Sequence, residues 1–320
     1  MRARSSFWQA LRFFSPAMNE SAASVVLYAT DRKGTMLMTI SLFITMILTG
    51  LLCIALPLTV FVVLRRRLAL RWGVFGIGML TFFVSQVVLR LPWQIPLTKA
   101  AAAHGWTTGW SGVLLGLGAA VTAGVFEEGG RYLTYRWLVR RPTRSDAIAL
   151  GLGHGGFESM ALVGVSIIAS GMVMFLVSQG ALPLPADQAA ALQPTLDKLA
   201  HTAWYEQLVA LLERASAISF HVAMSALVYT AYVRRKWLPL WGALGLHIVL
   251  DGSAALLAPR HLWLEELLLA VVAAVCLWGL VRFWKRGAGD AVHTAPAGRA
   301  DAPSDAVGVS AIATEKTDLL

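Results

Sequence analysis

Seven long apolar runs, separated by short polar stretches, dominate this chain of 320 residues. Each run is long enough to cross the ~30 Å hydrocarbon core of a bilayer as a helix. The chain is 57% hydrophobic and only 14% charged, with a mean hydropathy of +0.64. A water-soluble domain cannot bury so large an apolar surface. We therefore predict an all-α, polytopic integral membrane protein with about seven transmembrane helices, which has the lipid bilayer as its surroundings.

The predicted spans divide the chain into three parts. The spans cover residues 37–64, 72–90, 109–135, 146–177, 206–233, 239–258 and 262–282. Residues 36–286 are expected to form one transmembrane domain, preceded by an interfacial or disordered segment at 1–35. A disordered cytoplasmic tail is expected at 287–320, because this stretch is rich in Ala, Asp and Pro. A longer polar loop is expected at 178–205.

Arginine and lysine cluster in alternate loops, and this bias predicts the orientation of the protein. Fourteen basic residues follow spans one, three, five and seven, whereas the other loops hold four, including Arg90 and Lys99. Short cytoplasmic loops carry the excess of Lys and Arg. We therefore predict a multi-pass protein of the cell (cytoplasmic) membrane, with the N-terminus outside and the C-terminus inside. The net charge of +9 lies mostly in these clusters, so we expect no nucleic-acid partner.

Eight ionisable residues on spans three to six are predicted to lie at one depth of the membrane. At a rise of ~1.5 Å per residue, all of them fall about 12–20 Å from the cytoplasmic side. They are Glu127, Glu128 and Arg131 on span three, His154 and Glu158 on span four, His221 on span five, and His247 and Asp251 on span six. Ionisable residues within a bilayer are costly, which makes them candidates for function. Glu213 and Arg214 on span five lie ~30 Å from the cytoplasmic side, so we expect them to pair with each other near the outer interface, outside this layer.

Each of these residues also has a purely structural explanation. A lone intramembrane histidine commonly bonds to a neighbouring helix, and the glycines on both sides of His154 can serve close helix packing. Glu127, Glu128 and Arg131 can form an ion pair at the membrane edge. These explanations account for the residues singly but not for their common depth. Three histidines with several acids in one layer are typical of a proton-handling, metal-binding or hydrolytic site.

The order of the motifs resembles the glutamic-type intramembrane protease superfamily. That group includes the CAAX-processing (Abi) proteases, the PrsW proteases and the gamma-secretase scaffold subunit APH-1. The resemblance rests on Glu127-Glu128-x-x-Arg131, a histidine on the next helix, and His247-x-x-x-Asp251. The arginine stands one residue earlier than in the CAAX proteases. Asp251 replaces their asparagine, as in the PrsW-like branch.

Two short segments are most similar to the YhfC family within this superfamily. They are Phe-Glu-Glu-Gly-Gly-Arg-Tyr at 126–132 and Gly-His-Gly-Gly-x-Glu at 153–158. The resemblance covers residues from about 110 to 255. It implies that spans three to six form a four-helix catalytic core.

The resemblance implies an intramembrane endopeptidase acting on a membrane-protein or lipidated-peptide substrate. In this family Glu127 would be the general base that activates water, and His154 would help to hold that water. Arg131 would orient the glutamates. His247 and Asp251 would stabilise the oxyanion, although an ionised aspartate repels negative charge.

Three alternatives remain open from the sequence. His154, His221 and His247 are a possible ligand set for zinc in a metal-dependent protease, although we favour a mechanism without a cofactor because the glutamate pair already supplies a base. A non-catalytic membrane scaffold, similar to APH-1, would have the same helices and would bind a membrane partner without cleaving it. A proton-coupled transporter would use the same layer of acids and histidines as a relay.

Overall fold

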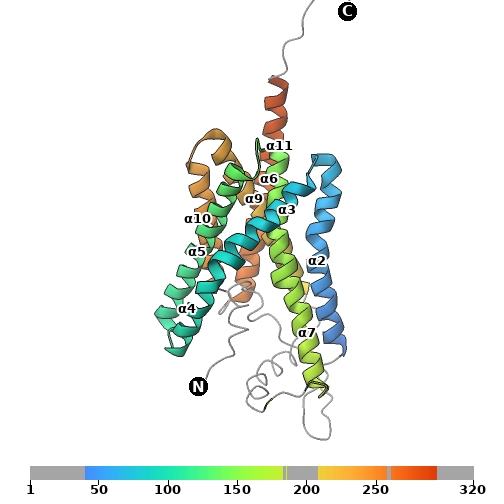
Figure 1. Ribbon diagram of the computed structural model, residues 1–320, viewed down its shortest axis with the longest axis vertical. Helices are drawn as coiled ribbons and strands as arrows, with labels where there is room; N and C mark the ends of the chain where they lie inside the picture. Colours follow the sequence, from blue (N-terminus) through green and yellow to red (C-terminus); the bar gives the residue numbers. More distant parts are fainter. Residues whose placement is uncertain (1–39, 183–184, 186–207, 258–260, 294–320) are drawn as a thin grey trace, which may run out of the picture.

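The protein is a bundle of long helices, shown in Figure 1 as a computed structural model. The structure describes residues 40–182, 185, 208–257 and 261–293. Within them, seven helical spans are long and apolar enough to cross a membrane, which confirms the predicted fold class. The segment predicted at 1–35, most of the loop predicted at 178–205 and the tail beyond residue 293 lie outside the described residues.

Four of the first six spans are single α-helices. They are α2 (Ile40–Leu68), α5 (Gly109–Trp137), α9 (Val209–Arg234) and α10 (Leu238–Leu257). Spans two and four each contain a π-helical segment, labelled η, between two α-helices. Span two consists of α3 (Trp72–Phe82), η2 (Phe83–Arg90) and α4 (Leu91–Ala103), and span four of α6 (Arg144–Phe157), η3 (Glu158–Gly164) and α7 (Val165–Ser178). The last helix, α11 (Leu262–His293), contains the seventh span and continues beyond Arg286.

Span two is longer than the sequence analysis predicted, which changes the place of Arg90. The helical span runs from Trp72 to Ala103, so Arg90 is not a loop residue as predicted but a buried residue within a membrane span. An arginine followed by Pro92 resembles a helix end. Here, however, the helix continues through Pro92, which directly follows η2, and a local π-helical adjustment is one way in which a membrane helix accommodates a proline.

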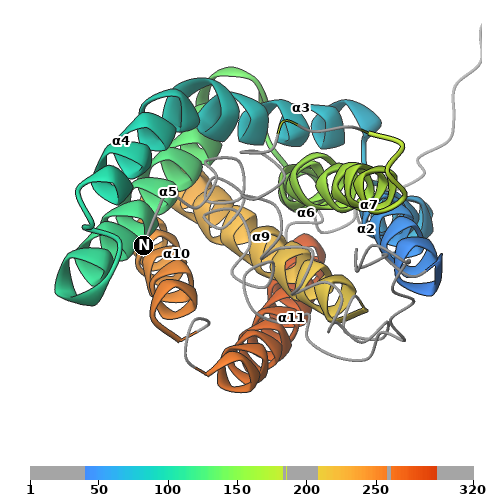
Figure 2. The ribbon, with the colours of Figure 1, turned by 90° about the horizontal axis from the view of Figure 1, so that it is seen from below.

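Glycines allow neighbouring helices to touch backbone to backbone around the middle of the bundle. A Cβ atom on Gly78 of α3 would collide with the carbonyl oxygen of Leu150, and one on Gly153 of α6 with that of Phe75. Similarly, Gly151 packs directly on the backbone of α9 at Val222. Small residues allow such close approach in membrane bundles. Helix α9 contacts α2, α5, α6, α10 and α11, and Figure 2 shows it near the centre of the bundle.

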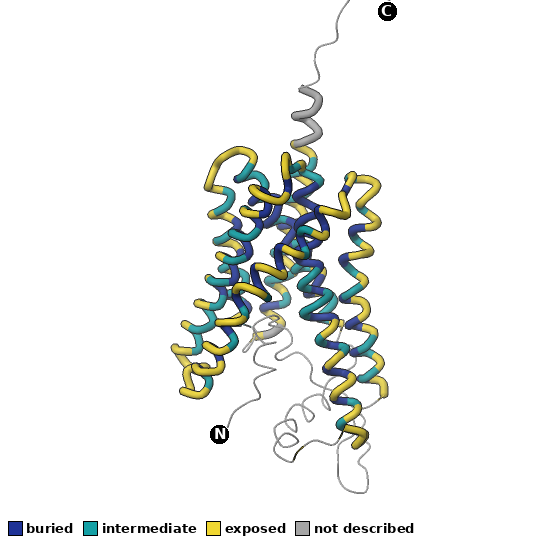
Figure 3. The backbone as a smooth tube through the Cα atoms, in the orientation of Figure 1, coloured by how far each residue is buried: buried dark blue, intermediate teal, exposed yellow. Residues whose placement is uncertain are grey.

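Burial is concentrated in the interior of the upper half of the bundle as drawn in Figure 3, while the outer surfaces are exposed. The exposed side chains include many large apolar ones, such as Ile40, Leu114, Val249 and Trp263. So extensive an exposed apolar surface is unfavourable in water and favourable in contact with lipid. The burial pattern therefore agrees with a membrane-embedded protein whose polar residues are enclosed by the helices.

The turns that carry the basic clusters lie together at one end of the bundle, at the top of Figure 1. We predict that this end faces the cytoplasm. In intact cells, Thr107→Cys in the turn between α4 and α5 is expected to react with a membrane-impermeant maleimide. Arg140→Cys is expected to react only after permeabilisation. The two native cysteines are buried and give little background. Labelling of Arg140→Cys in intact cells would contradict this orientation.

Candidate functional site

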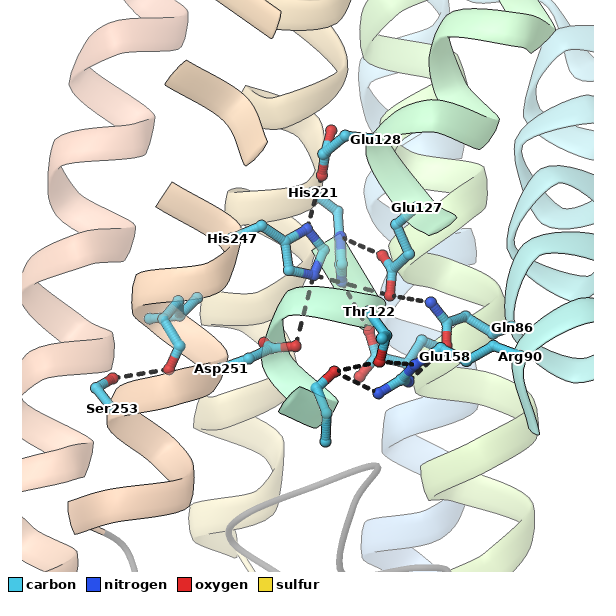
Figure 4. A network of polar contacts seen from close by, with 12 residues as sticks. Gln86, Arg90, Thr122, Glu127, Glu128, Glu158, His221, His247, Asp251 and Ser253 are labelled. Carbon is cyan, nitrogen blue, oxygen red and sulfur yellow. Dashed lines mark hydrogen bonds and ion pairs between the residues drawn. The ribbon is translucent and has the colours of Figure 1, made fainter. Parts of the chain in front are cut away.

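Glu127 lies at the centre of a buried polar network to which five spans contribute (Figure 4). One carboxylate oxygen, Oε1, accepts a hydrogen bond from Gln86 Nε2 at 2.9 Å. The other, Oε2, lies 2.9 Å from His154 Nε2 and 3.3 Å from Arg131 Nη2. Both oxygens are thus held by side chains from neighbouring helices, which fixes the plane of the carboxylate.

Three histidines each direct one ring nitrogen toward Glu127. His154 Nε2 and His221 Nδ1 lie 2.9 and 3.7 Å from Oε2. His247 Nε2 lies 3.8 Å from Oε1. The histidines come from α6, α9 and α10, and all three are buried. The glycines of α6 make this possible, because a Cβ on Gly155 would overlap the His221 ring.

The contacts of His221 determine which of its nitrogens carries the proton. Arg131 Nη2 lies 2.7 Å from Nδ1, and a guanidinium can only donate, so Nδ1 is the acceptor. The proton is therefore on Nε2, which donates to Glu158 Oε2 at 2.7 Å. Glu158 is held in turn by Arg214 Nη1 at 2.7 Å. Consequently, the lone pair on Nδ1 is bonded to Arg131, and the same nitrogen lies 3.7 Å from Glu127 Oε2.

His247 is oriented from the other side by Glu128. Its Nδ1 donates to Glu128 Oε1 at 2.7 Å, and the same oxygen also accepts from Arg131. Nε2 then faces two carboxylates, those of Glu127 at 3.8 Å and Asp251 at 3.7 Å. A proton on Nε2 would therefore be stabilised by both acids.

The charges of the network are close to balanced. It contains four carboxylates and three guanidinium groups. The carboxylates are Glu127, Glu128, Glu158 and Asp251, and the guanidinium groups are Arg90, Arg131 and Arg214. Buried charges are stable only when they are paired or coordinate a metal. One proton on a histidine would balance these charges, and a divalent metal ion would leave the network with a net charge of about +1.

Seven of the eight residues singled out from the sequence are joined in this network by hydrogen bonds. The eighth, Asp251, lies at its edge, with a side chain that is 39% exposed. Sequence reasoning missed three members. Gln86 carries no charge, Arg90 was assigned to a loop, and Arg214 was placed near the outer interface with Glu213, whereas it contacts Glu158. The helical spacing of Gln86 to Arg90 and of Arg214 to His221 is the signal by which they could have been found.

Donor atoms of Glu127, His154 and His221 lie within 4.8 Å of one another, as a metal site requires. Two imidazole nitrogens and one carboxylate oxygen are a ligand set found in catalytic zinc sites. The bond from His221 Nε2 to Glu158 also matches the carboxylate that commonly orients a metal-binding histidine. These residues therefore fit a divalent metal ion. The close group contains Glu127 in place of His247, which the sequence analysis had named as the third possible ligand.

The fold and the site together define a polytopic helical membrane protein with a cluster of acids and histidines enclosed between its helices. The model of the family described as YhfC intramembrane metalloprotease matches residues 52–273. The chain is also 32% identical over 248 residues to "Uncharacterized membrane protein YhfC" of Bacillus subtilis (strain 168), covering 73% of this chain and 93% of that protein. The chain belongs to the YhfC family. No solved structure matches it.

Proposed function

We propose that the protein is a metal-dependent intramembrane endopeptidase, which cleaves peptide bonds of membrane-protein or lipidated-peptide substrates. The observation that carries this proposal is the close group of Glu127, His154 and His221. The description of the family as intramembrane metalloproteases supports it. Zinc is the metal we expect, because the ligands are two imidazoles and a carboxylate.

Glu127, His154 and His221 would hold the metal in this mechanism. A zinc ion bound there would act as a Lewis acid and make water a better nucleophile at neutral pH. Arg131 and Gln86 fix the two oxygens of Glu127, and Glu158 fixes the ring of His221. These contacts hold the Glu127 carboxylate and the His221 ring in place, and Arg131 would have to release His221 Nδ1 for that nitrogen to bind the metal.

His247 is placed to move a proton during peptide hydrolysis. Its Nδ1 proton is committed to Glu128, so Nε2 is the atom that exchanges a proton with the reacting groups. A protonated Nε2, stabilised by Asp251 and Glu127, would donate to the oxygen that becomes negative at the scissile carbonyl or to the leaving nitrogen. This role assigns Asp251 to supporting the imidazolium of His247 and not to contacting the oxyanion.

The metal-free mechanism expected from the sequence is the second candidate, and the position of Arg131 favours it. Its Nη2 lies 2.7 Å from His221 Nδ1 and 3.3 Å from Glu127 Oε2. The Arg131 guanidinium thus already binds the lone pairs of His221 and Glu127 that a metal would need. In that mechanism Glu127 is the general base for water, and His154 holds the water beside it.

Metal analysis of the purified protein separates the two mechanisms. We predict about one zinc per chain, together with loss of activity in the presence of a chelator. Glu127→Gln, His154→Gln and His221→Gln should each lose the zinc. His104→Gln is the matched control, since His104 lies in the described turn between α4 and α5, outside the network. A protein that cleaves its substrate without bound metal would support the metal-free mechanism instead.

A further inference from the structure

Gln86 and Arg90 form a hydrogen-bonded pair that links span two to Glu127 (Figure 4). Arg90 Nη1 donates to Gln86 Oε1 at 2.7 Å, and Gln86 Nε2 donates to Glu127 Oε1 at 2.9 Å. The orientation of the Gln86 carboxamide is unambiguous, because an arginine can only donate and a carboxylate can only accept. Both side chains are buried, with relative exposures of 1% and 4%.

Arg90 is itself anchored to the helix that carries Glu127. Its Nη2 donates to the carbonyl oxygen of Ala119 at 2.7 Å, and its Nε donates to Thr122 Oγ1 at 3.3 Å. Ala119 and Thr122 lie on α5, about one to two turns before Glu127. The guanidinium therefore fixes Gln86 relative to the backbone of α5.

The π-helical geometry of span two occurs where this pair lies. Gln86 and Arg90 both belong to η2, and Glu158, which orients His221, begins η3. Within the part of the chain that the structure describes, these are the two π-helical segments. Such segments cost regular helical hydrogen bonding and are frequent at functional sites. Here both carry side chains of the Glu127 network.

We propose that Gln86 and Arg90 are positioning residues, which set the rotation of the Glu127 carboxylate. This inference rests on the proposed function of Glu127. With Oε1 bonded to Gln86, the other oxygen is directed at His154 and His221. The neutral carboxamide of Gln86 also stands between the Arg90 guanidinium and the Glu127 carboxylate. A second guanidinium in direct contact would stabilise the ionised carboxylate and weaken it as a base or a ligand.

The test compares Gln86→Leu with Gln94→Leu in the purified protein. Gln94 lies on the same buried face two turns along span two, and neither atom of its carboxamide has a hydrogen-bond partner among the described residues. Gln86→Leu is expected to lower kcat by ~10–100-fold with little change in KM, and to weaken zinc binding by a similar factor. Gln94→Leu is expected to change neither quantity.

Infrared spectroscopy gives a measurement that does not depend on cleavage or on metal. The Glu127 carboxylate band is identified by its absence in Glu127→Gln, and it is expected to shift in Gln86→Leu but not in Gln94→Leu. An unshifted band together with wild-type kcat in Gln86→Leu would overturn the positioning role. If wild-type protein neither cleaves nor binds zinc while the band still shifts, the proposed function fails and the positioning of Glu127 stands.

Discussion

Glu127→Gln is expected to remove nearly all cleavage of a membrane-embedded substrate, a loss of ~10²–10⁴-fold in rate. Glutamine keeps the shape of the side chain, and its carbonyl oxygen can still accept a hydrogen bond. It cannot accept a proton from water, and it is a much poorer ligand than a carboxylate. Both candidate mechanisms therefore lose activity. The assay is cleavage of a co-reconstituted substrate, with thermal unfolding measured on the same preparation.

The neighbouring carboxylate provides the matched control for this substitution. Glu128 is equally buried, but its contacts are to Arg131 and His247 and not to His154. Glu128→Gln should therefore lower activity less than Glu127→Gln and stability more. The zinc content of Glu127→Gln then separates its two roles, since loss of zinc indicates a ligand and retained zinc indicates a base. Wild-type cleavage by Glu127→Gln would reject both mechanisms, whereas absence of cleavage by the wild-type protein would favour a non-catalytic scaffold.

The membrane fold was predictable because hydropathy reports directly on the solvent of each segment. Apolar runs long enough to cross a bilayer must be helical, since lipid offers no hydrogen-bond partners to the backbone. The common depth of the ionisable residues followed from the helical rise and from the charge bias of the loops. That reasoning brought the glutamate pair and the histidines to one layer. In the structure His154 is hydrogen-bonded to Glu127, and His247 to Glu128.

The members of the network that the sequence analysis missed were lost for two physical reasons. Arg90 is a charged residue close to a proline, and such a pair is read as the end of a hydrophobic span. Arg90 was therefore assigned to a loop, and Gln86 was not recognised as its partner. Depth along one helix also does not determine which neighbour a side chain meets. Arg214 was therefore paired with its sequence neighbour Glu213 near the outer interface, although it reaches Glu158 on the adjacent span.

His154→Gln is expected to match the defect of Glu127→Gln, because His154 contacts the carboxylate oxygen Oε2 of Glu127. His154 is fully buried, and its Nε2 lies 2.9 Å from Glu127 Oε2, while its Nδ1 has no hydrogen-bond partner among the described residues. A glutamine at this position can still donate to Oε2. It offers no ring nitrogen to a metal and no imidazole beside the reacting water. The expected loss is again ~10²–10⁴-fold in rate.

The double variant Glu127→Gln/His154→Gln tests whether the two side chains form one functional unit. Residues that act as a unit are strongly non-additive, so the double variant should be little worse than either single one. Two independent contributions would instead multiply, which would place the double variant ~10⁴–10⁸-fold below the wild type. The measurement is the residual rate of substrate cleavage by the four proteins of the cycle, each at equal folded concentration. Multiplying losses would contradict a shared metal or water between Glu127 and His154.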